Sequence, residues 1–87
     1  MFVVVEHEVT DPATFWCIVS EEVDHLPDGL ELLQSLPNEF GTKEFSLWRT
    51  DTIEALQRFM EEKLALVSTS AMFPIHAGNA FGLPAAH

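Results

Sequence analysis

The order of the predicted secondary-structure elements is the feature that most constrains the fold of this chain. Apolar runs, helical periodicity and turn residues predict the order β–α–β–β–α–β within 87 residues. The predicted strands carry apolar side chains on both faces, whereas two short helices can cover only one face of a four-stranded sheet. A chain of this length buries only about 60–65% of its unfolded surface when it is alone. We therefore expect a homodimer in which a second copy covers the other face.

Turn residues and chain breakers set the boundaries of the predicted elements. Asp11 can cap a helix that begins at Pro12, where the missing N–H costs nothing. The spacing of Asp51 and Glu54 suits a capping box before the second helix. The predicted elements are a buried strand Phe2–Val9, a helix from Pro12 that stops near His25–Gly29, strands Leu30–Leu36 and Lys43–Thr50, a helix after Asp51, and a last strand Thr69–Ala77.

Each predicted helix carries one apolar stripe at i, i+3, i+4 spacing. Glu22 falls inside the first stripe, and because it is near the end of that helix we expect its carboxylate to reach water. The first stripe is Phe15, Ile18, Val19, Glu22 and Leu26, and the second is Leu56, Phe59, Met60, Leu64 and Val67.

Two split β–α–β units of this kind predict one α+β domain over residues 1–87, with a ferredoxin-like fold. The expected sheet is antiparallel in the order 4-1-3-2, with both helices on one face. The first strand is then central and the fourth lies at an edge. Pro74 supports this arrangement, because a strand accepts proline mainly at a sheet edge.

Side-chain alternation predicts which residues of the first and last strands share a face. We pair His7 near Ala71 and Phe2 near His76, because this register gives one face that is more apolar than the other. The more apolar face is expected under the helices, and the mixed face is expected at the dimer interface. The first holds Val3, Val5, His7, Phe73 and Ile75, and the second holds Phe2, Val4, Glu6, Met72, Pro74 and His76.

The charge of the chain excludes several classes of partner. Fourteen acidic residues against four basic ones give a formal net charge of -10. This acidic field repels phosphate backbones and anionic lipids, so we expect neither nucleic acid nor a membrane surface as partner. No run approaches the roughly 18 apolar residues of a membrane span, and the first residues lack the basic segment of a signal peptide. With Cys17 as the single cysteine, these features favour a cytoplasmic protein.

Segments spread over nearly the whole chain resemble a known superfamily. They are the strand Phe2–Val9, Asp11-Pro12 with Phe15-Trp16, Leu47-Trp48, the helix start Thr52–Leu56, and Phe73–Ala77. Together they resemble the dimeric α/β-barrel superfamily, in particular small uncharacterised members related to antibiotic-biosynthesis monooxygenases and muconolactone isomerases. The resemblance implies a homodimeric barrel with an apolar pocket between sheet and helices in each subunit.

The activities known in that superfamily differ in the residues that they require, and those residues can be looked for in this chain. Haem-degrading members need a haem-ligating histidine on the second helix, and residues 52–67 contain no histidine. We therefore exclude that activity and expect no cofactor. Cofactor-free monooxygenases line their pocket with polar and aromatic residues, and the resemblance implies such parts for Gln34 and Trp48. Isomerase-like members need a general base, for which the chain offers His7 and His76.

Each candidate residue also has a plainer interpretation. His7, between Glu6 and Glu8, is a candidate general base, or else a histidine satisfied by one hydrogen bond or an interface. His76 is a candidate ligand contact, or a residue that packs the dimer. Trp48 and Gln34 are candidate ligand contacts, or, for the aromatic ring, part of the core. A hairpin without irregularity would pair Leu32 with Trp48 and Gln34 with Ser46, but whether Gln34 and Trp48 share a face stays open.

No metal site is expected from the histidines. In the register above, His7 and His76 lie about five strand residues apart, roughly 16 Å, whereas metal ligands approach within about 2 Å of the ion. Two functions remain open. The first is a small-molecule-binding or purely structural dimer with an apolar pocket. The alternative is a cofactor-independent monooxygenase or isomerase that acts on a small organic compound with His7 as base.

Overall fold

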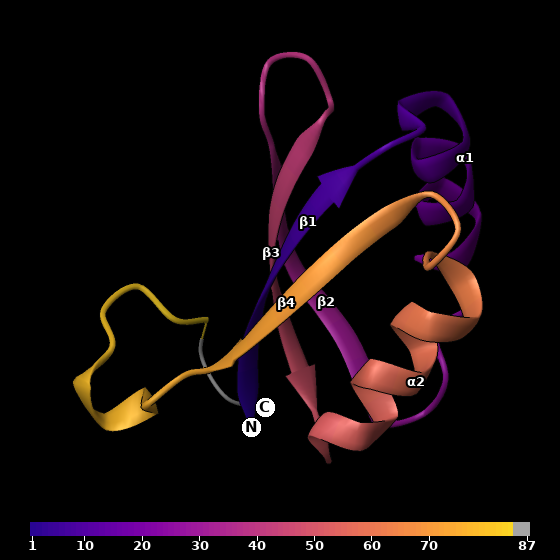
Figure 1. The fold of residues 1–87 in the computed structure, drawn as a ribbon. Helices are drawn as coiled ribbons and strands as arrows, with labels where there is room; N and C mark the ends of the chain where they lie inside the picture. The colour runs from indigo at the N-terminus through magenta and orange to yellow at the C-terminus, as the bar shows by residue number, and fades with distance from the viewer. Residues whose placement is uncertain (85–87) are drawn as a thin grey trace.

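The computed structural model describes residues 1–84 and contains the predicted order of elements (Figure 1). Within those residues, no helix combines the length and the apolar character needed to cross a membrane. The elements are β1 (Phe2–Val9), α1 (Pro12–Glu22), β2 (Leu30–Pro37), β3 (Lys43–Thr50), α2 (Ile53–Lys63), β4 (Ser68–Pro74) and a short 3₁₀ turn η1 (Ala77–Asn79).

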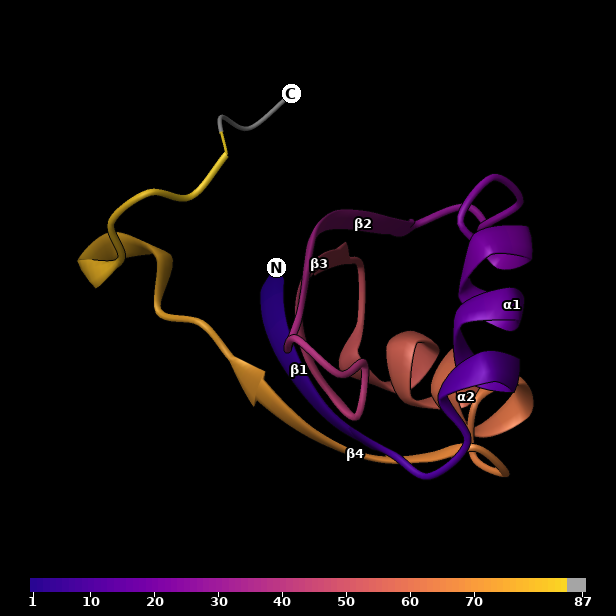
Figure 2. The ribbon, with the colours of Figure 1, turned by 90° about the horizontal axis from the view of Figure 1, so that it is seen from above.

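The four strands form one antiparallel sheet in the order β2-β3-β1-β4. This is the predicted order 4-1-3-2 read from the opposite edge. Both helices lie on the same side of the sheet (Figure 2). The arrangement is that of a ferredoxin-like fold. Pro74 is the last residue of the edge strand β4, which is where a strand tolerates a residue without an N–H.

The caps explain where the helices begin. Asp11 caps α1 as predicted, because its side chain accepts a hydrogen bond from the backbone N–H of Thr14 at 3.2 Å. The cap of α2 is Thr52 and not Asp51: the Thr52 hydroxyl accepts from the N–H of Ala55 at 3.2 Å. The capping-box prediction was therefore displaced by one residue. Both helices are short, with α1 ending at Glu22 rather than near His25.

The hydrophobic core lies between the helices and the face of the sheet that they cover, which we call the inner face. Val3 and Val5 of β1 are fully buried there, as predicted, and so is Phe15 of α1. The predicted stripe of α2 is also confirmed. The core cluster consists of Val3, Val5, Val9, Phe15, Leu30, Trp48, Leu56, Phe59, Met60, Leu64 and Val67.

The predicted register between β1 and β4 was wrong by one residue. His7 lies opposite Ser70, and Ala71 lies opposite Glu6. Because side chains alternate between faces, this shift places Met72 against the core and leaves Phe73 50% exposed on the other face. The N–H of Thr10 bonds to the carbonyl of Val67 at 2.8 Å just before β4 begins. This backbone contact fixes the register, since the strand carries apolar residues on both faces.

A β-bulge in β2 changes the pairing of the β2–β3 hairpin. Leu32 lies opposite Trp48, as an even pairing predicts, but Gln34 lies opposite Leu47 instead of Ser46. The extra residue, Leu33, shifts the alternation of side chains beyond it. Gln34 therefore moves off the inner face, and Ser35 comes to lie opposite Ser46.

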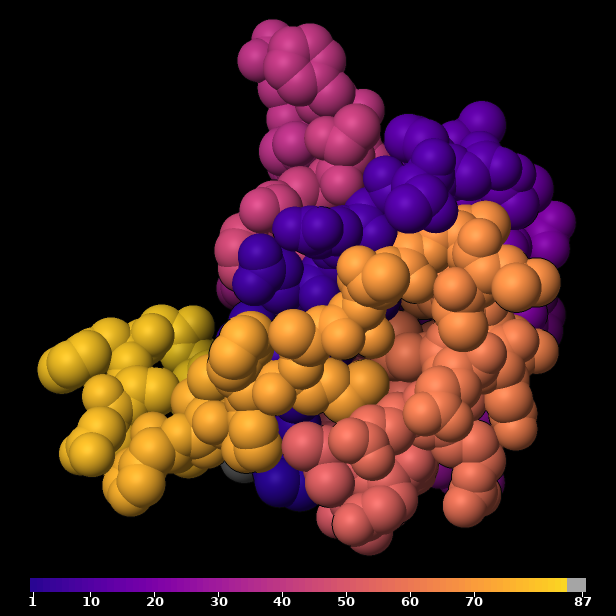
Figure 3. All heavy atoms as spheres, viewed as in Figure 1, coloured from indigo at the N-terminus to yellow at the C-terminus, as the bar shows by residue number. Residues whose placement is uncertain are grey.

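The face of the sheet without helices, which we call the outer face, carries an apolar centre. Val4 lies between Leu47 of β3 and Phe73 of β4, and Phe45 beside them is 46% exposed. Charged side chains surround this centre: Arg49 pairs with Glu31 at 2.7 Å, and Lys43 lies 3.6 Å from Glu6 and 3.7 Å from Glu8. The tip of the β2–β3 hairpin and the segment after β4 project from the body (Figure 3).

Candidate functional site

A cavity lies between the inner face of the sheet and the two helices. Its volume is about 20 Å³, which is room for about one water-sized group. Most of its wall is apolar, and its partly exposed side is formed by Glu22 of α1, Val23 just after that helix, and Lys63 of α2. The lining residues are His7, Phe15, Ile18, Val19, Glu22, Val23, Leu26, Leu32, Glu44, Ser46, Trp48, Phe59, Lys63 and Leu64.

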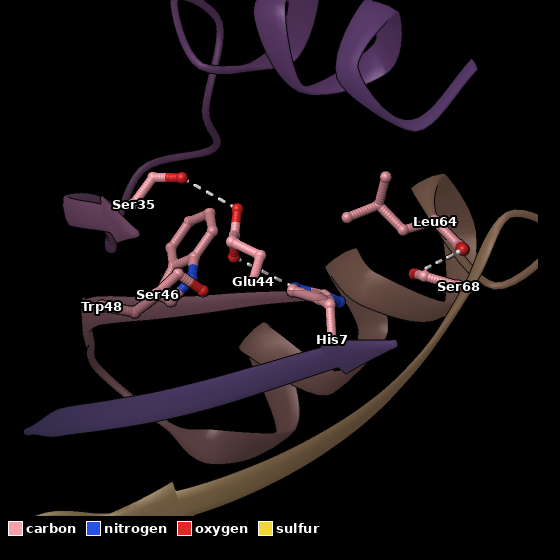
Figure 4. Close-up of polar contacts among 7 residues, drawn as sticks. All are labelled: His7, Ser35, Glu44, Ser46, Trp48, Leu64 and Ser68. Carbon is pink, nitrogen blue, oxygen red and sulfur yellow. Dashed lines mark hydrogen bonds and ion pairs between the residues drawn. The ribbon is translucent and has the colours of Figure 1, made fainter. Parts of the chain in front are cut away.

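Two ionisable side chains lie side by side on the sheet side of this cavity, which we call its floor. His7 of β1 and Glu44 of β3 are directly opposite each other on the two central strands (Figure 4). They are only 2% and 3% exposed. The Nε2 atom of His7 lies 3.9 Å from Oε1 of Glu44, which is longer than a hydrogen bond.

Neighbouring residues form hydrogen bonds with only some of the polar atoms of this pair. The hydroxyl of Ser35 donates to Oε2 of Glu44 at 2.8 Å, so the bulge in β2 supplies one partner of the carboxylate. Beside it, the indole N–H of Trp48 donates to the hydroxyl of Ser46 at 2.9 Å. The ring of His7 meets the ring of Phe15 in an edge contact, with centroids 5.3 Å apart. Strand residues and one aromatic ring of α1 thus hold the pair in place.

Two buried polar atoms remain without a hydrogen-bond partner among residues 1–84. They are Nδ1 of His7 and Oε1 of Glu44. The great majority of buried polar atoms in native proteins are paired, and one left unpaired costs about 1–3 kcal/mol. Two such atoms on two residues that line one cavity therefore mark this position as a candidate binding site.

Burial changes the ionisation of both groups in the direction of their neutral forms. Loss of water around His7 lowers its pKa to about 4. The same loss raises the pKa of Glu44, and the side chains of Ser35 and Ser46 oppose part of that rise. His7 is therefore neutral at pH 7. One of its ring nitrogens then carries a proton and the other accepts, and either nitrogen can be the acceptor.

An ion pair spans the partly exposed side of the cavity, which we call the mouth. Oε1 of Glu22 on α1 lies 3.5 Å from Nζ of Lys63 on α2. The side chain of Glu22 is 27% exposed, so it reaches water as expected. The pair connects the ends of the two helices across the route into the cavity.

The four site residues predicted from the sequence lie in different parts of the structure. His7 and Trp48 both line the cavity. Gln34 lies instead in a groove of about 260 Å³ between the outer face and residues 80–83. His76 follows β4 and is exposed. Neither Gln34 nor His76 lines the cavity, so the structure does not bring the four residues together.

Glu44 and Ser35 are site residues that the sequence analysis missed. Glu44 lies two and four residues before Ser46 and Trp48 on one strand, so strict alternation places all three on the face that buries the tryptophan. That signal could have identified Glu44. Ser35 could not have been found this way, because the bulge at Leu33 breaks the alternation.

Residues 1–84 contain no cluster of three or more His, Cys, Asp or Glu side chains that could hold a metal ion. Comparison of the chain with models of protein families, with curated proteins and with solved structures finds no match.

Proposed function

We propose that this chain binds a small, largely apolar organic molecule at the cavity between the sheet and the helices, with one small group inside the cavity and the rest of the molecule at its partly exposed side. The observation that carries the proposal is the pair of buried, unpartnered polar atoms, His7 Nδ1 and Glu44 Oε1, in an otherwise apolar wall. Small-molecule sites are typically apolar pockets with a few convergent polar groups and perturbed pKa values. The group inside the cavity would give a partner to the polar floor, and the rest of the molecule would cover apolar side chains at the partly exposed side.

The cost of the buried pair supports binding over a purely structural role. Apolar residues of similar volume in place of a buried ionisable pair are often neutral or stabilising. His7 and Glu44 are held among mostly apolar side chains; the hydroxyl of Ser35 donates to Glu44, and no direct hydrogen bond joins the two groups. A ligand that bonds either group offsets the cost of burying it.

The test is an NMR titration of ¹⁵N-labelled protein with single-ring compounds such as toluene and benzyl alcohol. We expect saturable shifts at the amides of His7, Phe15 and Trp48, which lie around the cavity. The variant Val19→Phe fills part of the cavity and should abolish the shifts. Its control is Ala13→Phe on the exposed side of the same helix. Binding that survives Val19→Phe, or no binding at all, would overturn the proposal.

We further propose that the chain is a homodimer of the dimeric α/β-barrel type. The antiparallel strand order supports this, and so does the outer face, whose apolar centre of Val4, Phe45, Leu47 and Phe73 has a charged rim. Sedimentation equilibrium should then give twice the 9.8 kDa of the chain. Phe45→Asp should give the monomer, whereas Phe40→Asp at the exposed hairpin tip should not. A monomeric wild type at micromolar concentration rules out the dimer.

One contact favours a second candidate function, a cofactor-independent monooxygenase or isomerase with His7 as base. Glu44 faces Nε2 of His7, and a carboxylate on one side of an imidazole can hold the proton there and leave the other nitrogen as the base. Nδ1 would then accept a proton from a bound compound.

Solvent exchange tests this second candidate. A compound that binds the cavity is incubated in D₂O, and deuterium uptake at its acidic C–H position is followed by NMR. We expect uptake with the wild type and its loss in His7→Gln. Equal uptake in wild type and His7→Gln would remove His7 as the base, without affecting the binding proposal.

A cytoplasmic location is also proposed. The support is Cys17, which is exposed, unpaired and the single cysteine of the chain, because free thiols persist in reducing compartments. Fractionation of cells that produce the protein tests this, and recovery with secreted proteins would contradict it.

A further inference from the structure

The gap between His7 and Glu44 has a length that one bridging atom can span. Nε2 of His7 and Oε1 of Glu44 are 3.9 Å apart and face each other in the cavity wall. An atom about 2.9 Å from each would bond to both. When the proton of neutral His7 is on Nδ1, both facing atoms are acceptors. The bridging group must then be a hydrogen-bond donor with at least two N–H or O–H bonds.

The charges around the cavity favour a cationic donor. Glu44 is a buried carboxyl group with no cation beside it: of the described residues that line the cavity, Lys63 alone is basic, and it pairs with Glu22 at the mouth. His7 does not supply the charge, since burial keeps it neutral at pH 7. A buried carboxylate is stabilised by a counter-ion that also bonds to it. The net charge of -10 also raises the local concentration of cations around the chain.

The size of the cavity suits a small head group with a larger body behind it. A volume of about 20 Å³ accepts a group the size of water, and an ammonium group is about that size. The apolar body would lie against Ile18, Val23 and Leu26 toward the mouth. An anionic head group would instead meet the carboxyl of Glu44 and find no cation on the floor.

Resting on the binding function proposed above, we propose that the ligand is a primary organic amine with an apolar body. Its ammonium group occupies the cavity, where it donates to Oε1 of Glu44 and Nε2 of His7, and its apolar body lies at the mouth against Ile18, Val23 and Leu26.

The experiment compares four compounds that share one ring and differ in the head group: benzylamine, benzyl alcohol, benzoate and toluene. Each is titrated at pH 7 into ¹⁵N-labelled wild-type protein, and binding is followed at the amides around the cavity. We expect benzylamine to bind about tenfold more tightly than benzyl alcohol or toluene, because a hydrogen bond to a charged group contributes about 1.5–3 kcal/mol. Benzoate should bind most weakly.

Two variants locate the head group. Glu44→Gln should lower the affinity for benzylamine about tenfold and leave that for toluene unchanged. Glu61→Gln, which removes an exposed carboxylate of α2 outside the cavity lining, should leave benzylamine binding intact. If Glu61→Gln lowers the affinity as much as Glu44→Gln does, the amine is held by surface charge and the inference is overturned. In the wild type, the ¹³C signal of the Glu44 carboxyl should shift with benzylamine and stay in place with toluene, a readout that does not depend on the folding of a variant.

The outcomes separate this inference from the binding function beneath it. If toluene or benzyl alcohol binds the cavity as tightly as benzylamine, or benzoate binds best, the amine proposal is overturned and the binding function stands. If none of the four compounds shifts the amides around the cavity, both are overturned.

Discussion

Nε2 of His7 and Oε1 of Glu44 face each other at 3.9 Å across the two central strands, and both side chains are almost completely buried. Each strand is flanked on both sides by another strand, so the backbone around the pair is rigid. Burial lowers the pKa of His7 and raises the pKa of Glu44, so it favours the neutral form of each group. This arrangement costs stability, and that cost can be measured in the protein alone.

His7 should make the stability of the fold depend on pH. Its pKa is lowered from 6.5 to about 4 in the folded state. Stability is therefore fully present above pH 6.5 and is lost as the pH falls toward 4, because the unfolded chain binds the proton first. The loss amounts to at most about 3 kcal/mol. Urea unfolding of wild type and His7→Gln between pH 4 and pH 7 should show that the substitution removes this part of the slope.

The control for this measurement is His25→Gln, because His25 is exposed. It retains His7, so its stability should still fall as the pH drops from 6.5 toward 4. Equal slopes for wild type and His7→Gln would mean that His7 accepts its proton in the folded state as easily as in the unfolded chain.

Glu44→Gln should raise the free energy of unfolding by about 1 kcal/mol at pH 8. The pKa of Glu44 is raised above 4.5 in the folded state, so the wild type loses stability as the pH rises above 4.5. Glutamine has no charge to bury and can still accept from Ser35. The gain should be smaller at pH 5 than at pH 8, as measured by urea unfolding.

A control carboxylate on α2 shows whether the gain in stability of Glu44→Gln comes from the burial of Glu44. Glu61 is exposed, so Glu61→Gln should change stability by less than about 0.5 kcal/mol at either pH. A clear loss of stability in Glu44→Gln at pH 8 would contradict the prediction and would indicate that the carboxylate has a stabilising charged partner.

Leu56 is the best place to test the packing of α2 against the sheet, because its side chain is fully buried in the core. Leu56→Ala should lower the free energy of unfolding by about 2–5 kcal/mol, through lost apolar burial and the cavity left behind. Leu66, just beyond the same helix, is 98% exposed, and Leu66→Ala should change stability by less than about 0.5 kcal/mol. Similar losses in both variants would be incompatible with this core.

Thr52, and not Asp51, should be the residue whose side chain starts α2. Thr52→Ala removes the hydroxyl that accepts from the N–H of Ala55 and should cost about 1 kcal/mol in thermal or urea unfolding. Asp51→Ala should cost less, since that residue lies outside the cap. A larger loss of stability in Asp51→Ala than in Thr52→Ala would instead support a capping box that begins at Asp51.

Local patterns in the chain were sufficient to predict the elements and the faces of the helices. β1 and β3 have the predicted bounds, Asp11 caps α1, and the stripe from Leu56 to Val67 is buried. These features depend on residues within a few positions of each other. A helix face follows from a repeat of 3.6 residues, and a cap from one side chain and the N–H three residues later.

Long-range pairing explains where the predictions failed. The β4 register was wrong by one residue because apolar residues lie on both faces of that strand, and the bond from Thr10 to Val67 sets its position. The bulge at Leu33 carried Gln34 away from Trp48, and it brought Ser35 to Glu44. No local pattern signals either event, since each depends on hydrogen bonds between strands distant in sequence.

The sequence by itself determined the order of elements, the antiparallel strand order and the burial of His7 on a central strand. Only the tertiary structure revealed that His7 faces Glu44, that Ser35 holds one carboxylate oxygen, and that two polar atoms remain unpartnered in an apolar cavity. The physical reason is the two-residue period of a strand: a shift of one residue reverses every side chain beyond it. The composition of the candidate site therefore depends on register, which hydrogen bonds between distant strands establish.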